Sequence, residues 1–138
     1  MMLLLTAACG RAEWREADTR LGAAAQAARD QGFVPLSGPN NTFGDFASHG
    51  EVVWRVNLDA GRTYFLAASC TTGCDTLDFD ITDQRGSEMA RDTSSGSSPR
   101  LVFTPPADGD YRVTFHYGSC AAERCRWIAQ VYEQRPPN

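Results

Sequence analysis

Polar and apolar residues alternate through much of the chain after residue 50, which is the period of a β-strand with one buried face. The alternation is clearest in VVWRVNL (52–58), LDFDIT (77–82) and DYRVTFHY (110–117), with shorter apolar runs in TYFLAAS, LVFT and RWIAQVYE and a weaker one in GSEMARD. About seven short strands separated by turn residues predict a mainly-β fold, an antiparallel jelly-roll-like β-sandwich. The residues expected to face inward are Val52, Trp54, Val56, Leu58, Leu77, Phe79, Ile81, Tyr111, Val113, Phe115 and Tyr117.

The chain ahead of residue 51 follows a different pattern. From Glu13 to Gln31 apolar residues recur at helical spacing, and Gly32 follows as a C-terminal cap, so we expect one short N-terminal α-helix. Its apolar stripe is mostly alanine, which favours docking on the protein over lying on a membrane. Residues 33–50 are rich in Pro, Gly and Asn and predict an irregular connector. We therefore expect a helix and connector over residues 10–50, a sandwich over 51–133 and a tail over 134–138. The helical stripe consists of Trp14, Ala17, Leu21, Ala24 and Ala28.

The first nine residues, MMLLLTAAC, predict a truncated signal peptide. The small residues before Cys9 resemble a bacterial lipobox, which implies that Cys9 carries lipid after cleavage. The alternative is a frayed apolar N-terminus with an ordinary thiol. Because no later stretch approaches the ~18 apolar residues of a spanning helix, membrane attachment is expected through Cys9 alone. The expected location is the periplasm or the outer-membrane surface.

Four further cysteines occur in two close pairs, SCTTGC and SCAAERC. An even number in a small exported domain predicts two disulfides, and the short spacings favour pairing within each pair. A four-cysteine zinc site and unbridged thiols are the alternatives, although structural zinc favours a two-residue spacing. The four residues are Cys70, Cys74, Cys120 and Cys125.

Length and charge narrow the function classes. The 138 residues fit one domain, and we expect a monomer. The net charge is −4, and the 13 basic residues form no basic stripe. Since binding to phosphates needs such a stripe, nucleic acid is an unfavoured partner.

Three carboxylates follow one another closely in DFDITDQRG: Asp78, Asp80 and Asp83. Asp78 and Asp80 share one face of the predicted strand, and Asp83 in the following turn could fold toward them. Oxygen ligands gathered in this way would suit calcium, but a solvated polar face is the more common role of alternating aspartates. A catalytic carboxylate pair would need an enclosed cleft, which short loops do not predict. We therefore expect no cofactor, with calcium as the open alternative.

The histidines and the aromatic residues offer other chemistry. His116 is expected to face outward on its strand, and His49 lies in a turn. No G-x-S-x-G motif accompanies them, so a serine triad has no sequence support. Aromatic residues on an outer face could stack on sugars or anchor a protein, although strand aromatics usually complete a core. The candidates are Trp54, Tyr64, Phe65, Tyr117, Trp127 and Tyr132.

Four segments between Glu51 and Glu133 resemble the bacterial pre-peptidase C-terminal domain: VVWRVNLDAGRTYFLAAS, DFDITDQRG, RLVFTPPADGDYRVTF and WIAQVYE. The resemblance implies a jelly-roll-like sandwich of the kind often appended to secreted peptidases, and some relatives bind calcium. The cysteines and the alanine-rich helix depart from the family pattern. We expect a non-catalytic envelope protein that binds an unknown protein or glycan. The alternatives are a small secreted hydrolase and an inhibitor of an envelope enzyme on the same fold.

Overall fold

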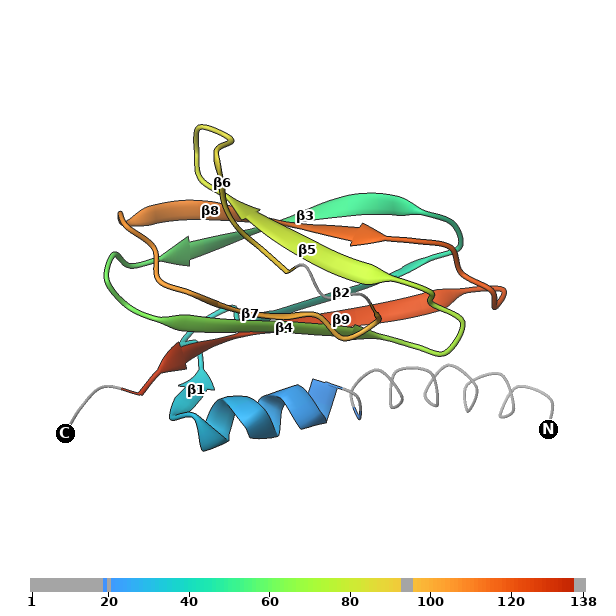
Figure 1. Cartoon of the computed structure of the whole chain (residues 1–138), viewed down its shortest axis with the longest axis horizontal. Coiled ribbons are helices and arrows are strands. Elements are labelled where there is room, and N and C mark those ends of the chain that lie inside the picture. The colour runs from blue at the N-terminus through green and yellow to red at the C-terminus, as the bar shows by residue number, and fades with distance from the viewer. Residues whose placement is uncertain (1–18, 20, 93–95, 136–138) are drawn as a thin grey trace.

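The computed structural model describes residues 19, 21–92 and 96–135. Within these ranges a helix at residues 21–30 is followed by nine strands (Figure 1). The strands are β1 (Phe33–Pro35), β2 (Asn41–Phe46), β3 (Gly50–Leu58), β4 (Tyr64–Cys70), β5 (Leu77–Thr82), β6 (Glu88–Arg91), β7 (Arg100–Phe103), β8 (Gly109–Tyr117) and β9 (Cys125–Gln134).

The strands form two antiparallel sheets that lie one over the other (Figure 1). In the first sheet β9 pairs with β1 and β2 on one side and with β4 on the other, and β7 follows β4. In the second sheet the order is β3-β8-β5-β6. The mainly-β sandwich with one short helix that the sequence predicts is therefore confirmed.

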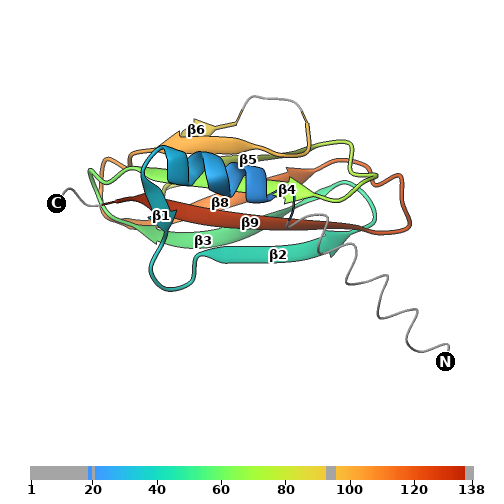
Figure 2. The same ribbon diagram turned by 90° about the horizontal axis from the view of Figure 1, so that it is seen from below.

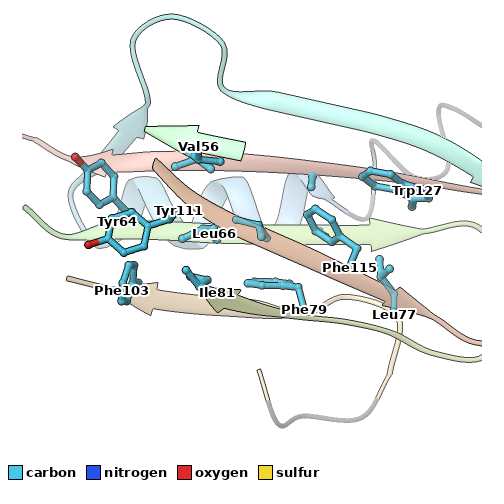
Figure 3. Close-up of a cluster of buried hydrophobic side chains, with 14 of the residues drawn as sticks. Val56, Tyr64, Leu66, Leu77, Phe79, Ile81, Phe103, Tyr111, Phe115 and Trp127 are labelled. Carbon is cyan, nitrogen blue, oxygen red and sulfur yellow. The ribbon is translucent and has the colours of Figure 1, made fainter. Parts of the chain in front are cut away.

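One apolar layer fills the space between the sheets (Figure 3). The inward residues predicted for β5 and for most of β8 are buried, as alternation requires. Phe115 lies at the middle of this layer, with its ring centroid 5.0 Å from that of Trp127 in the opposite sheet and 5.7 Å from that of Phe79. The two sheets are therefore joined through stacked and tilted rings.

The helix covers the outer face of the first sheet (Figure 2). Leu21, Ala24 and Ala28 are buried against Phe65 and Tyr132, so the described part of the predicted alanine stripe docks on the sandwich. Trp14 and Ala17 lie outside the described residues. Gly32 ends the helix with a φ of 87° and its N–H bonded to the carbonyl of Arg29, which confirms the predicted cap. Across the described part of the chain we find no helix suited to crossing a membrane.

Two sequence expectations about this region are wrong. Residues 33–50 are not an irregular connector, because β1 and β2 lie there and both pair with β9. The partner strand supplies the hydrogen bonds that the Pro- and Asn-rich local sequence does not predict.

Val52 is also not hidden, since it is 36% exposed at the free edge of the second sheet. Alternation predicts the face of the sheet on which a side chain lies, but a side chain on an edge strand has fewer neighbours to cover it.

Candidate functional site

A cluster of charged residues lies on the outer face of the second sheet. The register of β5 with β8 places Asp78 opposite His116 and Asp80 opposite Thr114. On the other side of β8, Glu51 of β3 is also opposite His116. Paired residues project to the same face of a sheet, and the inner face carries the apolar layer, so these polar side chains gather outside.

His116 bridges two of the carboxylates. Its Nε2 lies 2.7 Å from Oδ2 of Asp80, and its Nδ1 lies 3.4 Å from Oε2 of Glu51. The side chain of Asp80 is 13% exposed, whereas that of Glu51 is 64% exposed. The contact with Asp80 is thus the shorter and better shielded of the two, and it fixes the imidazole on the sheet.

Arg91 borders the cluster from β6, where it is opposite Asp80. Its guanidinium donates to Oε1 of Glu88 at 2.6 and 2.9 Å, and these bonds raise the pKa of Arg91 above its usual range; Asp80 and Asp78 act in the same direction. A hollow of about 260 Å³ lies between Asp78, Asp80, Arg91 and His116. The site therefore combines carboxylates, an imidazole and a permanent cation on an open surface.

This geometry suits ion pairing better than nucleophilic catalysis. In a serine-type mechanism one imidazole nitrogen must face the nucleophile while the other is oriented by a carboxylate. Here both nitrogens of His116 face carboxylates. Carboxylates on either side of the ring hold the imidazole in place and leave no ring nitrogen directed at a hydroxyl or thiol.

Of the three aspartates predicted as a calcium site, Asp78 and Asp80 line the same hollow, whereas Asp83 is hydrogen-bonded within its own turn. Asp83 lies in the turn after β5, where its Oδ1 accepts hydrogen bonds from the N–H groups of Arg85 at 2.9 Å and Ser87 at 3.0 Å. Asp80 is instead held by His116. Within the described ranges no group of three or more His, Cys, Asp or Glu residues is arranged to hold a metal ion. Calcium binding at these residues stays a prediction.

The same outer face continues toward the other end of the sheet. Val53 is opposite Thr114, and Arg55 is opposite Arg112, so a row of arginines follows the acidic cluster. Val53 is 51% exposed. The face therefore carries negative charge near one end, positive charge beyond it and an apolar side chain between the two.

Both predicted disulfides form within their own pair, Cys70–Cys74 and Cys120–Cys125. They lie side by side, because Cys74 and Cys120 form an isolated β-bridge. Cys70 and Cys125 are fully buried. Together the two bridges close one end of the sandwich. Cys9, predicted to carry lipid, lies outside the described residues.

The loop of residues 121–124 between Cys120 and Cys125 is exposed. The guanidinium of Arg124 lies 3.0 Å from a carboxylate oxygen of Asp45 on β2, which ties the loop to the first sheet. A hollow of about 540 Å³ is lined by Ala122, Glu123, Arg124 and Arg126. The disulfide therefore joins the two residues that flank this loop, and the ion pair of Arg124 holds the last residue of the loop.

The six aromatic residues considered as a binding surface do not form an exposed patch. Tyr64 and Trp127 lie in the core, and Phe65 and Tyr132 face outward but lie beneath the helix. Tyr117 is half-buried and stacks on Phe46, and Trp54 is half-buried and stacks on Phe115. His49, considered from the sequence as a possible ligand or base, is exposed in the turn before β3.

Sequence reasoning placed Asp78, Asp80 and His116 on outward positions but did not join them, and it missed Glu51 and Arg91. Each of these two residues enters the cluster through strand pairing, Glu51 opposite His116 and Arg91 opposite Asp80. The cluster could have been predicted only if the pairing of β8 with β3 and β5 were known, because that pairing places charged residues directly opposite His116.

No family model matches the chain, and no curated protein matches it in sequence. Several solved structures share its architecture. One is PliG of Aeromonas hydrophila, a periplasmic lysozyme inhibitor of g-type lysozyme, with a TM-score of 0.50 and 16% identity over 73% of this chain and 93% of that chain. Another is the pre-peptidase C-terminal domain of a collagenase from Bacillus anthracis, with a TM-score of 0.47 and 14% identity over 66% and 88% of the two chains. At such identities the likeness to PliG concerns the β-sandwich fold alone.

Proposed function

We propose that this chain is an exported, non-catalytic binding protein that presents the outer face of its second sheet to a partner protein in the cell envelope. The observation that carries this proposal is the difference between the two outer faces. The helix packs over Phe65 and Tyr132 on the outer face of the first sheet, whereas the face of the second sheet carries exposed charges in ordered rows and no covering helix among the described residues. Rigid strands hold these charges in fixed positions, which favours selective pairing with a complementary surface.

The chemistry of this face favours a protein over a glycan. Sugar recognition commonly uses flat aromatic rings, and the six rings considered as a binding surface are packed in the core, beneath the helix or against one another. Phe43 is 64% exposed, but it lies on β2 of the first sheet and not on this face. Charged side chains around an apolar residue such as Val53 are more typical of a protein interface with a polar rim.

The contacts of His116 support a non-catalytic role. Its two ring nitrogens are directed at Asp80 and Glu51, so its interactions position charge on the surface. If the protein were a hydrolase that used this imidazole, replacing His116 with alanine would abolish turnover of an envelope substrate. We expect the purified protein to have no such turnover to lose.

Export is supported by the two disulfides, because such bonds persist in oxidising compartments. We place the lipid anchor at Cys9. Metabolic labelling with a fatty-acid analogue should mark the wild-type chain in the membrane fraction, and Cys9→Ser should remove the label and release the chain. Labelling that persists in Cys9→Ser would place the modification elsewhere.

Site-specific photo-crosslinking in cells tests the binding surface. A photoreactive amino acid in place of Thr114, at the centre of the open face, should capture a partner, and the yield should fall as salt screens the charges. The matched control replaces Gln26, which is exposed on the covering helix. Cross-links from position 26 without cross-links from position 114 would overturn the assignment of the face.

A second candidate function is inhibition of an envelope enzyme by the loop of residues 121–124. The disulfide and the Arg124–Asp45 ion pair hold this exposed loop in place, and a pre-organised loop loses little entropy when it enters a concave site. PliG of Aeromonas hydrophila is an inhibitor on the same fold. Inhibition assays against envelope hydrolases should separate the two functions. Arg124→Ala should weaken loop-based inhibition, whereas Arg112→Ala on the sheet face should not.

A further inference from the structure

In the part of the chain that the structure describes, three of the four sheet edges are protected against pairing with another chain. β6 is four residues long and its register shifts at Ile81/Thr82. β7 is also four residues long, and Pro105 follows shortly after it. The edge beyond β9 is divided between β1, which contains Pro35, and the six-residue β2. Short strands, bulges and prolines are the usual means of blocking an edge.

β3 lacks these features. It is nine residues long, and all nine residues pair with β8 in one unbroken register. Among the described residues β8 is its only strand partner, so the opposite side of β3 presents a row of backbone donors and acceptors. Residues 50–53 are exposed on both faces, including Val52 at 36% and Val53 at 51%. A long, regular edge with exposed valines is a strong candidate for strand pairing between molecules.

The residues of this edge identify a second copy of the chain as the partner. We propose that β3 pairs in antiparallel fashion with β3 of another molecule about a two-fold axis at Val53, which joins the two second sheets into one. In that register Glu51 of each copy lies opposite Arg55 of the other, and the two Val53 side chains meet at the axis. The interface is isologous and contains two equivalent pairs of opposite charge.

Other registers of the same pairing are less favourable. Outward residues must oppose outward residues, so the axis has to pass through a residue and not between two residues. An axis at Trp54 places Glu51 opposite Asn57, and an axis at Arg55 places two arginines face to face. An axis at Glu51 opposes two glutamates. The register centred on Val53 is the one that pairs charges of opposite sign.

Glu51 and Arg55 are both available for these contacts. The side chain of Glu51 is 64% exposed, and its Oε2 lies 3.4 Å from Nδ1 of His116. Arg55 is exposed on the same face of β3. The sequence alone led us to expect a monomer, and the shape and charge of this edge favour a dimer. This proposal concerns the edge of β3 and does not depend on the partner proposed for the sheet face.

Charge reversal provides a specific test by sedimentation equilibrium of the purified chain at low salt. Wild type should show a reversible monomer–dimer equilibrium. Glu51→Arg and Arg55→Glu should each weaken the dimer at least about tenfold, because each places like charges opposite one another twice. The double reversal, Glu51→Arg with Arg55→Glu, should restore dimerisation. An equimolar mixture of the two single variants should form a heterodimer, since every opposed pair then has opposite sign.

The matched control is Arg112→Glu, which changes the same charge on the same face but lies on the interior strand β8, and it should leave the dimer intact. Far-UV circular dichroism and melting of each variant check that the fold is retained. The proposal is overturned if wild type stays monomeric at several hundred micromolar. It is also overturned if the single reversals dimerise as wild type does, or if the mixture of the two does not associate.

Discussion

The carboxylate of Asp80 is held 2.7 Å from His116 on a largely shielded part of the second sheet. We expect Asp80→Ala to lower the free energy of unfolding by about 1 kcal/mol, because the substitution removes one hydrogen bond to a half-exposed imidazole. Asp78→Ala is the matched control on the same strand and face, and it should stay within about 0.5 kcal/mol of wild type. Urea unfolding at neutral pH measures both. Equal losses for the two variants would show that the contact with His116 contributes nothing.

Tyr64 gives the protein a sensitivity to alkaline pH. Its side chain is buried and its hydroxyl oxygen accepts a hydrogen bond from the N–H of Asp59 at 2.9 Å. Burial raises the pKa of Tyr64 above its ordinary value of 10.0, although the bond from Asp59 opposes this shift. The folded state therefore holds the proton more tightly than the unfolded state, and this contribution is complete below about pH 10 and is lost as the pH rises through the raised pKa.

Unfolding free energies measured in urea between pH 8 and pH 11.5 should therefore fall at the alkaline end. Tyr64→Phe should fall less steeply, relative to its own value at pH 8, because it has no phenol to ionise at this position. Curves of identical slope for the two proteins would assign the alkaline loss to other groups.

Single residues in the cluster could be placed on a face from the sequence, but their contacts could not be predicted. Alternation puts Asp80 and His116 outward on separate strands, and it contains no information about which strands pair or in what register. Glu51 lies 65 residues before His116 and meets it only because β3 pairs with β8. The hydrogen-bonded cluster is thus a product of long-range pairing, whereas its polarity is a local property.

At the scale of elements, the two disulfides form one brace at the end of the sandwich. Each closes a very short loop, and loop-closure entropy predicts a loss of about 2 kcal/mol when either bridge is removed by replacing both cysteines with serine. Because Cys74 and Cys120 form a β-bridge, removal of both bridges should cost less than the sum of the separate losses. Chemical unfolding of the three variants measures this coupling.

Wild type treated with a phosphine reductant serves as a second route to the same state. Its stability should approach that of the variant that lacks both bridges. If reduction leaves the unfolding curve unchanged, the bridges do not stabilise the folded chain.

Elements with regular alternation could be predicted closely, and β5 runs over Leu77–Thr82 as expected. The strand β2 could not be predicted in this way, and Gly44 illustrates the reason. In the sequence this glycine indicates a turn, but in the structure it lies opposite Trp127, and a Cβ atom there would meet Nε1 of the indole at 2.9 Å. The glycine makes room for the ring to lie over the strand. Its role depends on a neighbour more than 80 positions away, so local composition gives the wrong element.

At the scale of the whole molecule, the sequence supports the fold class but not the choice of binding face. Strand alternation predicts two sheets with polar outer faces, and either face could have been open. The choice is made by the helix, whose alanine stripe packs on Phe65 and Tyr132 of the first sheet. The outward aromatic residues predicted as a binding surface are thereby covered, and the charged face of the second sheet is left exposed.

The single core predicts cooperative loss of the whole sandwich when its centre is removed. Phe115 is 1% exposed, and its ring packs against Trp127 of the first sheet as well as Phe79 and Trp54 of the second. Phe115→Ala should lower the unfolding free energy by about 3–5 kcal/mol, a large part of the 5–15 kcal/mol typical of a domain. Val102→Ala, at a half-exposed position, should cost about 0.5 kcal/mol or less. Urea unfolding followed by circular dichroism and tryptophan fluorescence should give coincident transitions for every variant, and separated transitions would mean that the two sheets unfold independently.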